Sequence, residues 1–237
     1  MKPFWTKTPT FIQKLFFNYL WKIKNNENKI YLTFDDGPIP NVTEWVLDLL
    51  KKENIKATFF CIGENIKKHP EIFKKIVIDG HAIGNHTFNH LNGWKANTNK
   101  YIENFELCEK EMEVGSGKLE DENTKLETEH LKLNTEHLIP NTIHSKLFRP
   151  PYGKIKYSQA KKIRKKGYKI IMWDVLSYDF DATVSPENCY TNVIKNVSSG
   201  SIIVFHDSLK AAKNMKYALP MAIQKLKEKG FVFDKIN

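Results

Sequence analysis

The sequence contains few cysteines, and they are far apart. Cys61, Cys108 and Cys189 are the three among 237 residues. Their spacing gives neither the framework of a small disulfide-rich domain nor a Cys-x-x-Cys metal clip. Because Cys61 ends an apolar run, we expect it to be a core residue. A hydrophobic content of 41%, with 12% aromatic residues, is sufficient for a sizeable globular core.

The chain also lacks a long uninterrupted apolar run. The apolar patch over residues 11–22 is broken by Lys14 and Asn18, and no small-residue cleavage site follows it, so no secretory signal is evident. The patch is too short to span a bilayer. We interpret residues 1–28 as an amphipathic extension packed on the domain, with peripheral membrane contact through residues 11–22 as the alternative. The expected location is the cytoplasm or the membrane surface.

Acidic residues are outnumbered by basic ones. The 27 Asp and Glu face 37 Lys and Arg, which gives a formal charge of +10 at pH 7. Such a balance can favour nucleic acids, acidic lipid headgroups or anionic polymers. No basic motif with interleaved aromatic residues is present, so we predict a Lys-rich solvated surface and no specific nucleic-acid partner.

One segment is repetitive and locally acidic. Residues 118–138 consist of three seven-residue units, KLEDENT, KLETEHL and KLNTEHL. Three units with unevenly spaced leucines are too few for a coiled coil. We therefore predict a solvent-exposed insert over about residues 116–142 in a connection between a helix and a strand. His130 and His137 recur because the unit recurs, and we do not expect them to be ligands.

The remaining chain alternates predicted strands with predicted helices. A strand is expected just before Arg149, and others where short apolar runs meet turn residues, at 29–34, 57–61, 81–84, 168–173, 201–205 and 231–233. Apolar residues at helical spacing predict helices over 42–52, 64–79, 101–114, 158–166, 186–196 and 217–229. This alternation indicates a parallel sheet or barrel, and the simplest account is one domain over residues 29–237.

Two adjacent carboxylates, Asp35 and Asp36, follow the first predicted strand and precede Gly37 and Pro38. Folds of the α/β class place their chemistry at the carboxyl ends of strands. Neighbouring side chains of an extended chain point to opposite sides, so the two carboxylates should meet different partners, for example a metal and a water. Taken alone, the residues also fit an ordinary Asp-Asp-Gly turn.

Two histidines, His86 and His90, are four residues apart, which on a helical turn places them on one face. Imidazole pairs at this spacing suit a divalent transition metal. Two surface histidines are the alternative for this pair alone. Combined with Asp35 and Asp36 at another strand end, the metal site is the better interpretation.

Four sequence blocks then follow one another in a recognisable order. They are Thr33-Phe34-Asp35-Asp36-Gly37-Pro38, His86-Thr87-x-x-His90, Arg149-Pro150-Pro151-Tyr152-Gly153 and Val204-Phe205-His206-Asp207. From residue 29 to the C-terminus, without the repeat insert, the chain resembles the polysaccharide deacetylases, the NodB-homology proteins of carbohydrate esterase family 4. The resemblance implies an α/β fold, a distorted (β/α) barrel of about seven parallel strands. It also implies metal-dependent removal of acetyl groups from N-acetylated amino sugars in a polysaccharide, oligosaccharide or glycolipid.

The resemblance implies the metal ligands and the base. Asp36, His86 and His90 would bind the divalent metal, commonly zinc, although other transition metals also fit. Asp35 would be the general base that takes a proton from the attacking water, and Arg149 would pair with Asp35 and orient it.

The resemblance also implies groups that stabilise the oxyanion and protonate the leaving amine. The backbone N–H of Tyr152 would help to hold the oxyanion. His206 would be the general acid, with Asp179 setting its charge. The family's fourth motif usually reads Asp-x-x-Asp-Trp, whereas Leu176 and Phe180 replace its first and last residues here. These departures affect the identity of the substrate more than catalysis.

Three further residues are expected to contact substrate. Phe180 and Val204 would wall an apolar pocket for an acetyl methyl, and Pro151 would lie beside it. Asp174 is interpreted as structural or supporting.

The chemistry of amide cleavage agrees with this assignment. A metal polarises the carbonyl and lowers the pKa of water to near 7, a carboxylate takes a proton, and an imidazole returns one to nitrogen. Two titrating groups with opposite duties predict a bell-shaped pH–rate profile. An O-acetyl esterase or a deformylase on the same site stays open, as does a non-catalytic glycan-binding protein. We expect a monomer with a carbohydrate substrate.

Overall fold

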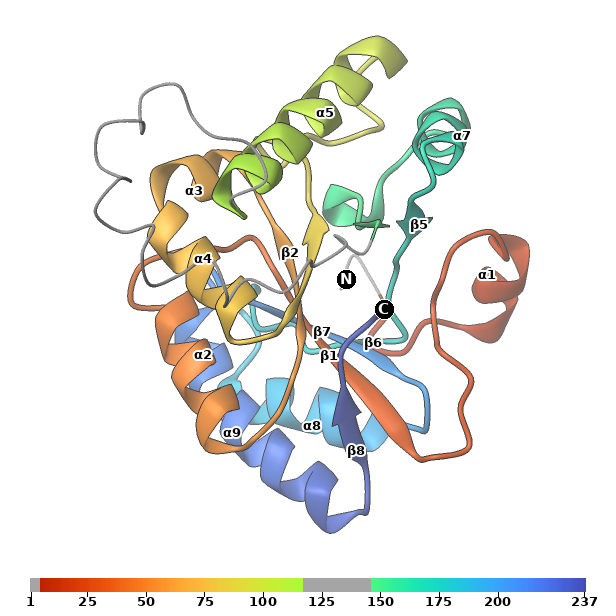
Figure 1. Ribbon diagram of the computed structural model, residues 1–237. Coiled ribbons are helices and arrows are strands. Elements are labelled where there is room, and N and C mark those ends of the chain that lie inside the picture. Colours follow the sequence, from red (N-terminus) through yellow and green to blue (C-terminus); the bar gives the residue numbers. More distant parts are fainter. Residues whose placement is uncertain (1–4, 117–145) are drawn as a thin grey trace.

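The structure is a computed structural model that describes residues 5–116 and 146–237 (Figure 1). Its strands are β1 (Lys29–Asp35), β2 (Thr58–Cys61), β3 (Ala82–Asn85), β4 (Leu147–Phe148), β5 (Lys169–Ile170), β6 (Val175–Leu176), β7 (Ile202–His206) and β8 (Val232–Asp234). Its helices are α1 (Thr10–Leu15), α2 (Thr43–Lys52), α3 (Gly63–Lys68), α4 (Pro70–Ile78), α5 (Thr98–Gly115), α7 (Tyr157–Lys165), α8 (Pro186–Asn196) and α9 (Ala212–Glu228). A short 3₁₀ turn spans Pro151–Gly153.

The strands form one parallel sheet in the order β5-β4-β3-β2-β1-β7-β6. Strand β8 also pairs in parallel, with the beginning of β1. The seven strands curl into a half-barrel, with helices α2, α8 and α9 gathered on one side and α3, α4 and α5 on another (Figure 1). The predicted distorted (β/α) barrel of about seven parallel strands is therefore confirmed.

The register of the sheet brings the carboxyl ends of three strands together. Asp35 is the last residue of β1, and it pairs with Phe60 of β2 and with His206, the last residue of β7. Asn85 ends β3 and pairs with Phe148 of β4. Because all these strands are parallel, the segments that follow them meet at one edge of the half-barrel.

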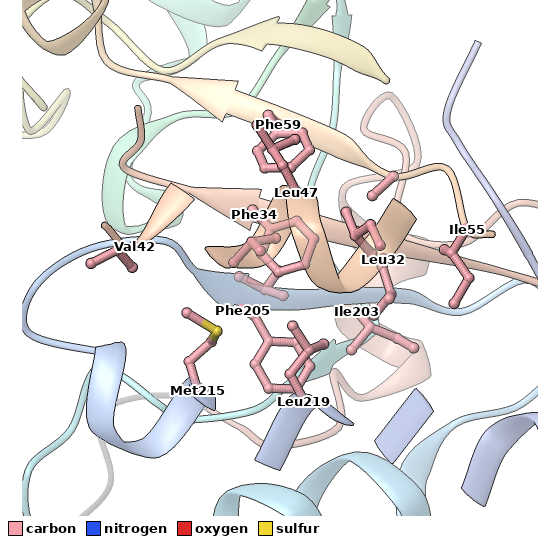
Figure 2. Close-up of a cluster of buried hydrophobic side chains, with 14 of the residues drawn as sticks. Leu32, Phe34, Val42, Leu47, Ile55, Phe59, Ile203, Phe205, Met215 and Leu219 are labelled. Carbon is pink, nitrogen blue, oxygen red and sulfur yellow. The ribbon is translucent and has the colours of Figure 1, made fainter. Parts of the chain in front are cut away.

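The main core lies between the sheet and the helices that cover it (Figure 2). Phe34 of β1 stacks on Phe59 of β2 with the ring centroids 5.0 Å apart, and Phe205 of β7 lies 6.4 Å away on the other side. Met215 and Leu219 of α9 reach the same cluster, and both are fully buried. Burial of this kind, at about 25 cal/mol per Å² of apolar surface, fixes the strand on which Asp35 is carried.

Several helices end where local signals predict. Helix α8 matches the predicted range, because the Ser185 side chain caps it and Pro186 occupies its first turn. The single helix predicted over 64–79 is wrong. Pro70 has no backbone N–H to continue α3, and His69 leaves the helical conformation, so α4 starts as a separate helix.

Three other boundaries differ from the sequence prediction. Strand β6 was not predicted because two residues carry no periodic signal. Strand β5 covers two residues of the predicted 168–173. Helix α9 begins at Ala212 rather than at residue 217, and it accommodates Pro220 in its interior.

The N-terminal segment, residues 5–28, pairs with the two ends of the open sheet. Leu20 N–H donates to Ile170 O and Met172 N–H to Leu20 O, both at 2.8 Å, next to β5. On the other side, Leu176 N–H of β6 donates to Thr6 O at 2.9 Å. Helix α1 buries no residue fully, but Ile12 packs against a core cluster and Gln13 Nε2 donates to Asp174 Oδ1 at 3.2 Å. The helix and the extended backbone on either side of it thus both contact the domain.

No helix among the described residues has the length and apolarity needed to cross a membrane. The three repeats at 118–138 lie outside the described residues. The three cysteines are fully buried, and Cys61 is a core residue as expected.

Candidate active site

Three side chains at the carboxyl edge of the sheet converge in an arrangement that could hold a metal ion. Asp36, His86 and His90 each offer one ligand atom, and these atoms lie within 4.8 Å of one another. Asp36 Oδ1 is 3.4 Å from His90 Nε2 and 3.8 Å from His86 Nε2. A tetrahedral ion with bonds of about 2.0–2.1 Å separates its ligand atoms by about 3.4 Å. The spacing therefore fits a divalent transition metal.

The hydrogen bonding and protonation of these ligand atoms also suit a metal ion. Asp36 Oδ1 is buried and has no hydrogen-bond partner among the described residues, which is costly unless a cation compensates. His86 Nδ1 is 2.8 Å from the carbonyl of Arg149, so it donates its proton there and leaves Nε2 free to ligate. Burial lowers the pKa of His86 well below its usual value, which keeps the ring neutral as a ligand must be.

A loop, rather than the predicted helical turn, brings the histidines together. Residues 86–90 follow β3 as irregular backbone, and Thr87 and His90 have φ values of 66° and 57°. The loop is held because Thr87 N–H donates to Asn85 Oδ1 at 2.7 Å, and Thr87 Oγ1 accepts from Leu91 N–H at 2.9 Å. Asp36 also has a positive φ, of 86°, so the turn after β1 aims its carboxylate at the loop.

Asp35 faces a different partner from Asp36, as the sequence predicts. Arg149 Nη1 donates to Asp35 Oδ1 at 2.6 Å and to Thr33 Oγ1 at 2.7 Å. Its Nη2 donates to Met172 O at 3.0 Å, and the guanidinium lies 4.1 Å from the centre of the Phe60 ring. Arg149 is fully buried and has its donors engaged, so it holds the Asp35 carboxylate in one position.

His206 is held by the carboxylate of Asp179. Its Nδ1 is 2.8 Å from Asp179 Oδ1, and its backbone N–H donates to Asp179 Oδ2 at 2.7 Å. Ser177 Oγ also donates to Asp179, at 2.9 Å. Burial disfavours the charged imidazole, but the charge and hydrogen bond of Asp179, together with the charges of the neighbouring Asp36 and Asp35, raise the pKa of His206 to about 9. With this pKa, the imidazole of His206 is protonated at neutral pH.

Asp207 secures the turn that carries Asp36. It accepts from Gly37 N–H at 3.0 Å and from Thr43 Oγ1 at 2.6 Å. A Cβ at position 37 would lie 1.9 Å from Asp207 Oδ2, so only glycine allows this approach. Burial, with a contribution from the charge of Asp36, raises the pKa of Asp207 to about 7. The sequence block that contains Asp207 marked it, but nothing in the sequence showed that it supports the turn.

These groups surround a cavity of about 400 Å³. Eight residues singled out in the sequence line it, namely Asp35, Asp36, His86, His90, Tyr152, Phe180, Val204 and His206. Two others, Arg149 and Asp179, are fully buried behind Asp35 and His206. Pro151 is not among the lining residues, and its neighbour Pro150 takes the place predicted for it. The structure therefore brings ten of the eleven site residues that the sequence predicts together around one cavity.

Further residues complete the cavity wall. They are Trp173, Leu176, Ser208 and Lys210, together with Pro150. The sequence already marks Leu176, because it occupies the position at which the polysaccharide deacetylases usually have an aspartate. Trp173 precedes Asp174, whose carboxylate is buried and accepts from Lys7 and Ser201, which is a structural role.

The site belongs to a recognisable class. A group of ligands for a divalent metal, a carboxylate fixed by a buried Arg and a protonated imidazole face one cavity at the carboxyl edge of a parallel sheet. A metal with a base and an acid on either side of it is the arrangement of a metal-dependent hydrolase.

Comparison with known proteins identifies the family. The polysaccharide deacetylase family model matches residues 22–171, more than half of the chain. A peptidoglycan-N-acetylglucosamine deacetylase of Bacillus cereus is 34% identical over 90% of this chain and 88% of its own. A chitooligosaccharide deacetylase of Azorhizobium caulinodans is 32% identical over 78% of this chain and 77% of its own. The chain belongs to the polysaccharide deacetylase family.

A solved structure supports the same assignment at the level of the fold. The crystal structure of a peptidoglycan N-acetylglucosamine deacetylase superposes with a TM-score of 0.79 and 32% identity. The match covers 97% of this chain and 95% of that one. The N-terminal segment and the half-barrel are thus both inside the range of the match.

Proposed function

We propose that this chain removes the acetyl group from N-acetylglucosamine units of a glycan, with a zinc ion held by Asp36, His86 and His90. The observation that carries the proposal is the buried, unpartnered Asp36 Oδ1 between two histidine Nε2 atoms. Two imidazoles and one carboxylate are a usual ligand set for catalytic zinc, and they leave positions for water and substrate. When bound, the ion supplies a Lewis acid that polarises the amide carbonyl and acidifies water.

Asp35 is proposed as the general base. Its carboxylate is positioned by Arg149 at 2.6 Å and lines the cavity next to Asp36. The guanidinium fixes the Asp35 carboxylate at the cavity wall, where Asp35 can accept a proton from the attacking water. The backbone N–H of Tyr152 is proposed to donate to the oxyanion. Tyr152 has a φ of 59° and lies in the tight turn that brings this part of the backbone to the cavity.

His206 is proposed as the general acid. An amine leaves an amide only when its nitrogen is protonated, and a pKa of about 9 keeps His206 charged at neutral pH. Asp179 holds Nδ1, so Nε2 is the atom that gives the proton. Phe180 packs against the His206 ring with the centroids 4.9 Å apart, and Val204 lies next to them in the wall. These two apolar side chains would receive the acetyl methyl.

The proposal is tested by measuring acetate released from N-acetylglucosamine oligosaccharides and from peptidoglycan fragments. The wild-type chain should release acetate from at least one of them, and His86→Ala should release none and bind no zinc. The partly exposed His69 is a matched control, since His69→Ala removes an imidazole that does not line the cavity. Full activity in His86→Ala would refute the proposed ligand set. Since every proposed group comes from one chain, we propose that a monomer is active.

Contact with a membrane surface is proposed for the N-terminal segment. Phe11, Leu15 and Phe17 are 63%, 66% and 77% exposed, and Lys14 lies among them. Exposed aromatic and aliphatic side chains beside a lysine suit the interface of an anionic bilayer. Sedimentation with phosphatidylglycerol vesicles should decrease in a Phe11→Ser, Phe17→Ser double variant, and unchanged sedimentation would contradict this contact.

A further inference from the structure

A second cavity adjoins the proposed active site. It has a volume of about 310 Å³, and we call it the aromatic groove. Half of its twelve lining residues come from the N-terminal segment, namely Trp5, Thr8, Ile12, Phe16, Tyr19 and Trp21. All six precede residue 22, where the match to the family model begins. Half of the lining of the groove therefore comes from a part of the chain that the family model does not match.

The aromatic groove and the catalytic cavity share walls. Tyr152 and Trp173 line both cavities. Tyr152 also packs edge-on against His90, with the ring centroids 4.4 Å apart. The groove is therefore within reach of a polymer that has one unit in the catalytic cavity.

The walls of the groove are fixed before any ligand arrives. Trp21 Nε1 donates to Phe16 O at 3.1 Å, and Trp94 Nε1 donates to Ile155 O at 3.3 Å. Thr8 Oγ1 donates to Trp173 O at 2.8 Å. Since these polar atoms are engaged with backbone, the groove presents ring faces in set positions. Such preorganisation lowers the entropy cost of binding.

The chemistry of the lining restricts the ligand. No described residue of the groove is charged, so the bound part is neutral. Trp5, Trp94 and Tyr152 at its edge are 55%, 60% and 47% exposed, so the groove is a half-open slot. A hydrocarbon chain gains only from the surface that leaves water and would stay half wet here. A sugar ring has a C–H face for the aromatic rings and a hydroxyl edge that can stay in water.

Polar groups border the aromatic groove. A further cleft, which shares Tyr152 with the groove, is lined by Asn89, Asn92, Lys95 and Lys154 among others. Lys154 Nζ lies 5.4 Å from the centre of the Trp94 ring, so donors border the aromatic slot. We infer that the aromatic groove is a binding site for a second, non-reacting pyranose ring of the glycan, stacked between N-terminal aromatic residues and Trp94. This inference rests on the proposed function only in that a glycan occupies the catalytic cavity.

Trp94→Ala and Trp5→Ala test the groove, because neither residue lines the catalytic cavity. Binding of an N-acetylglucosamine pentamer is measured by calorimetry in an Asp35→Asn background, which prevents turnover. Each tryptophan variant should raise the Kd of the pentamer about tenfold, the effect of losing one good aromatic contact. In protein that keeps Asp35, each tryptophan substitution should lower kcat/KM about tenfold for the pentamer and change it by less than twofold for the N-acetylglucosamine monomer. Melting temperatures confirm that the variants fold.

Phe17→Ala is the matched control, because Phe17 is an exposed aromatic residue of the same segment that does not line the groove. It should change neither quantity. Pentamer binding and kinetics that are unchanged in both tryptophan variants would overturn the inference. It would also be overturned if dodecanoate bound in a Trp94-dependent way while the pentamer did not. If no sugar released acetate but pentamer binding still depended on Trp94 and Trp5, the proposed activity would fail and the groove would stand.

Discussion

Asp179→Asn tests whether the charge on His206 is set by its buried carboxylate partner. The substitution keeps the size of the side chain and an oxygen acceptor, but it removes the negative charge 2.8 Å from His206 Nδ1. Burial then acts with much less opposition, because the remaining charges of Asp36 and Asp35 contribute less than Asp179 does. We expect the pKa of His206 to fall from about 9 to no higher than its ordinary 6.5.

The size of the effect follows from the proton occupancy of the imidazole. At pH 7.5, about 97% of a group with the higher pKa is protonated, and at most about 9% of a group with the lower one. Amide cleavage that needs a protonated His206 should therefore slow at least about tenfold at this pH. The alkaline limb of the kcat/KM profile should move down by about 2.5 pH units. A bound cation offsets the charges of Asp35 and Asp36, so the shift between the two proteins is the quantity to compare.

The same interaction makes stability depend on pH in a defined direction. The pKa of His206 is higher in the folded chain than its ordinary value. Its contribution to the free energy of unfolding is therefore full below pH 6.5 and is lost as the pH rises through about 9. It amounts to about 3 kcal/mol. Urea unfolding at pH 6 and pH 10 should show this loss in the wild type and little of it in Asp179→Asn. An alkaline limb that stays in place in the variant would refute the role given to Asp179.

Three other changes have expected outcomes. Arg149→Met should lower the free energy of unfolding by about 3–5 kcal/mol, because it leaves the Asp35 carboxylate buried without its partner. Urea unfolding measures this loss, and the control is Lys166→Met, which breaks an exposed ion pair and should cost under about 1 kcal/mol. Equal losses in the two variants would contradict the prediction. His206→Ala should reduce hydrolysis of N-acetyl amides far more than that of O-acetyl esters, which need less protonation of the leaving group, and equal losses on both would argue against a general acid. Val204→Ala should raise kcat/KM for N-propionyl relative to N-acetyl sugars by about tenfold or more, and an unchanged ratio would remove Val204 from the acyl pocket.

The sequence predicts the fold well where local signals and burial agree. Helix α8 begins at the Ser185 cap and Pro186, and strands β1 and β7 are rich in apolar residues and buried at all positions but one each. The break at His69 and Pro70 overrides an apolar pattern that continues through it. The two-residue strand β6 is defined only by its pairing with β7 and with the N-terminal segment.

The residue types of the candidate site were available from the sequence, but their geometry was not. His86 and His90 have a helical spacing, yet irregular backbone with positive φ at His90 brings their rings to Asp36. The wall residues Trp173 and Lys210 carry no motif, and only the curl of the sheet places them at the cavity. The aromatic groove likewise depends on Trp21 and Trp94, which are far apart in the chain.

The most direct test of the account is zinc titration of chelator-treated protein while acetate release from N-acetylglucosamine oligosaccharides is followed. We predict that the chelator abolishes release, that one equivalent of zinc restores it, and that Asp36→Ala protein recovers nothing. Release that persists without metal, or that zinc restores equally in Asp36→Ala, would contradict the assignment of Asp36, His86 and His90 as the metal site that drives the reaction.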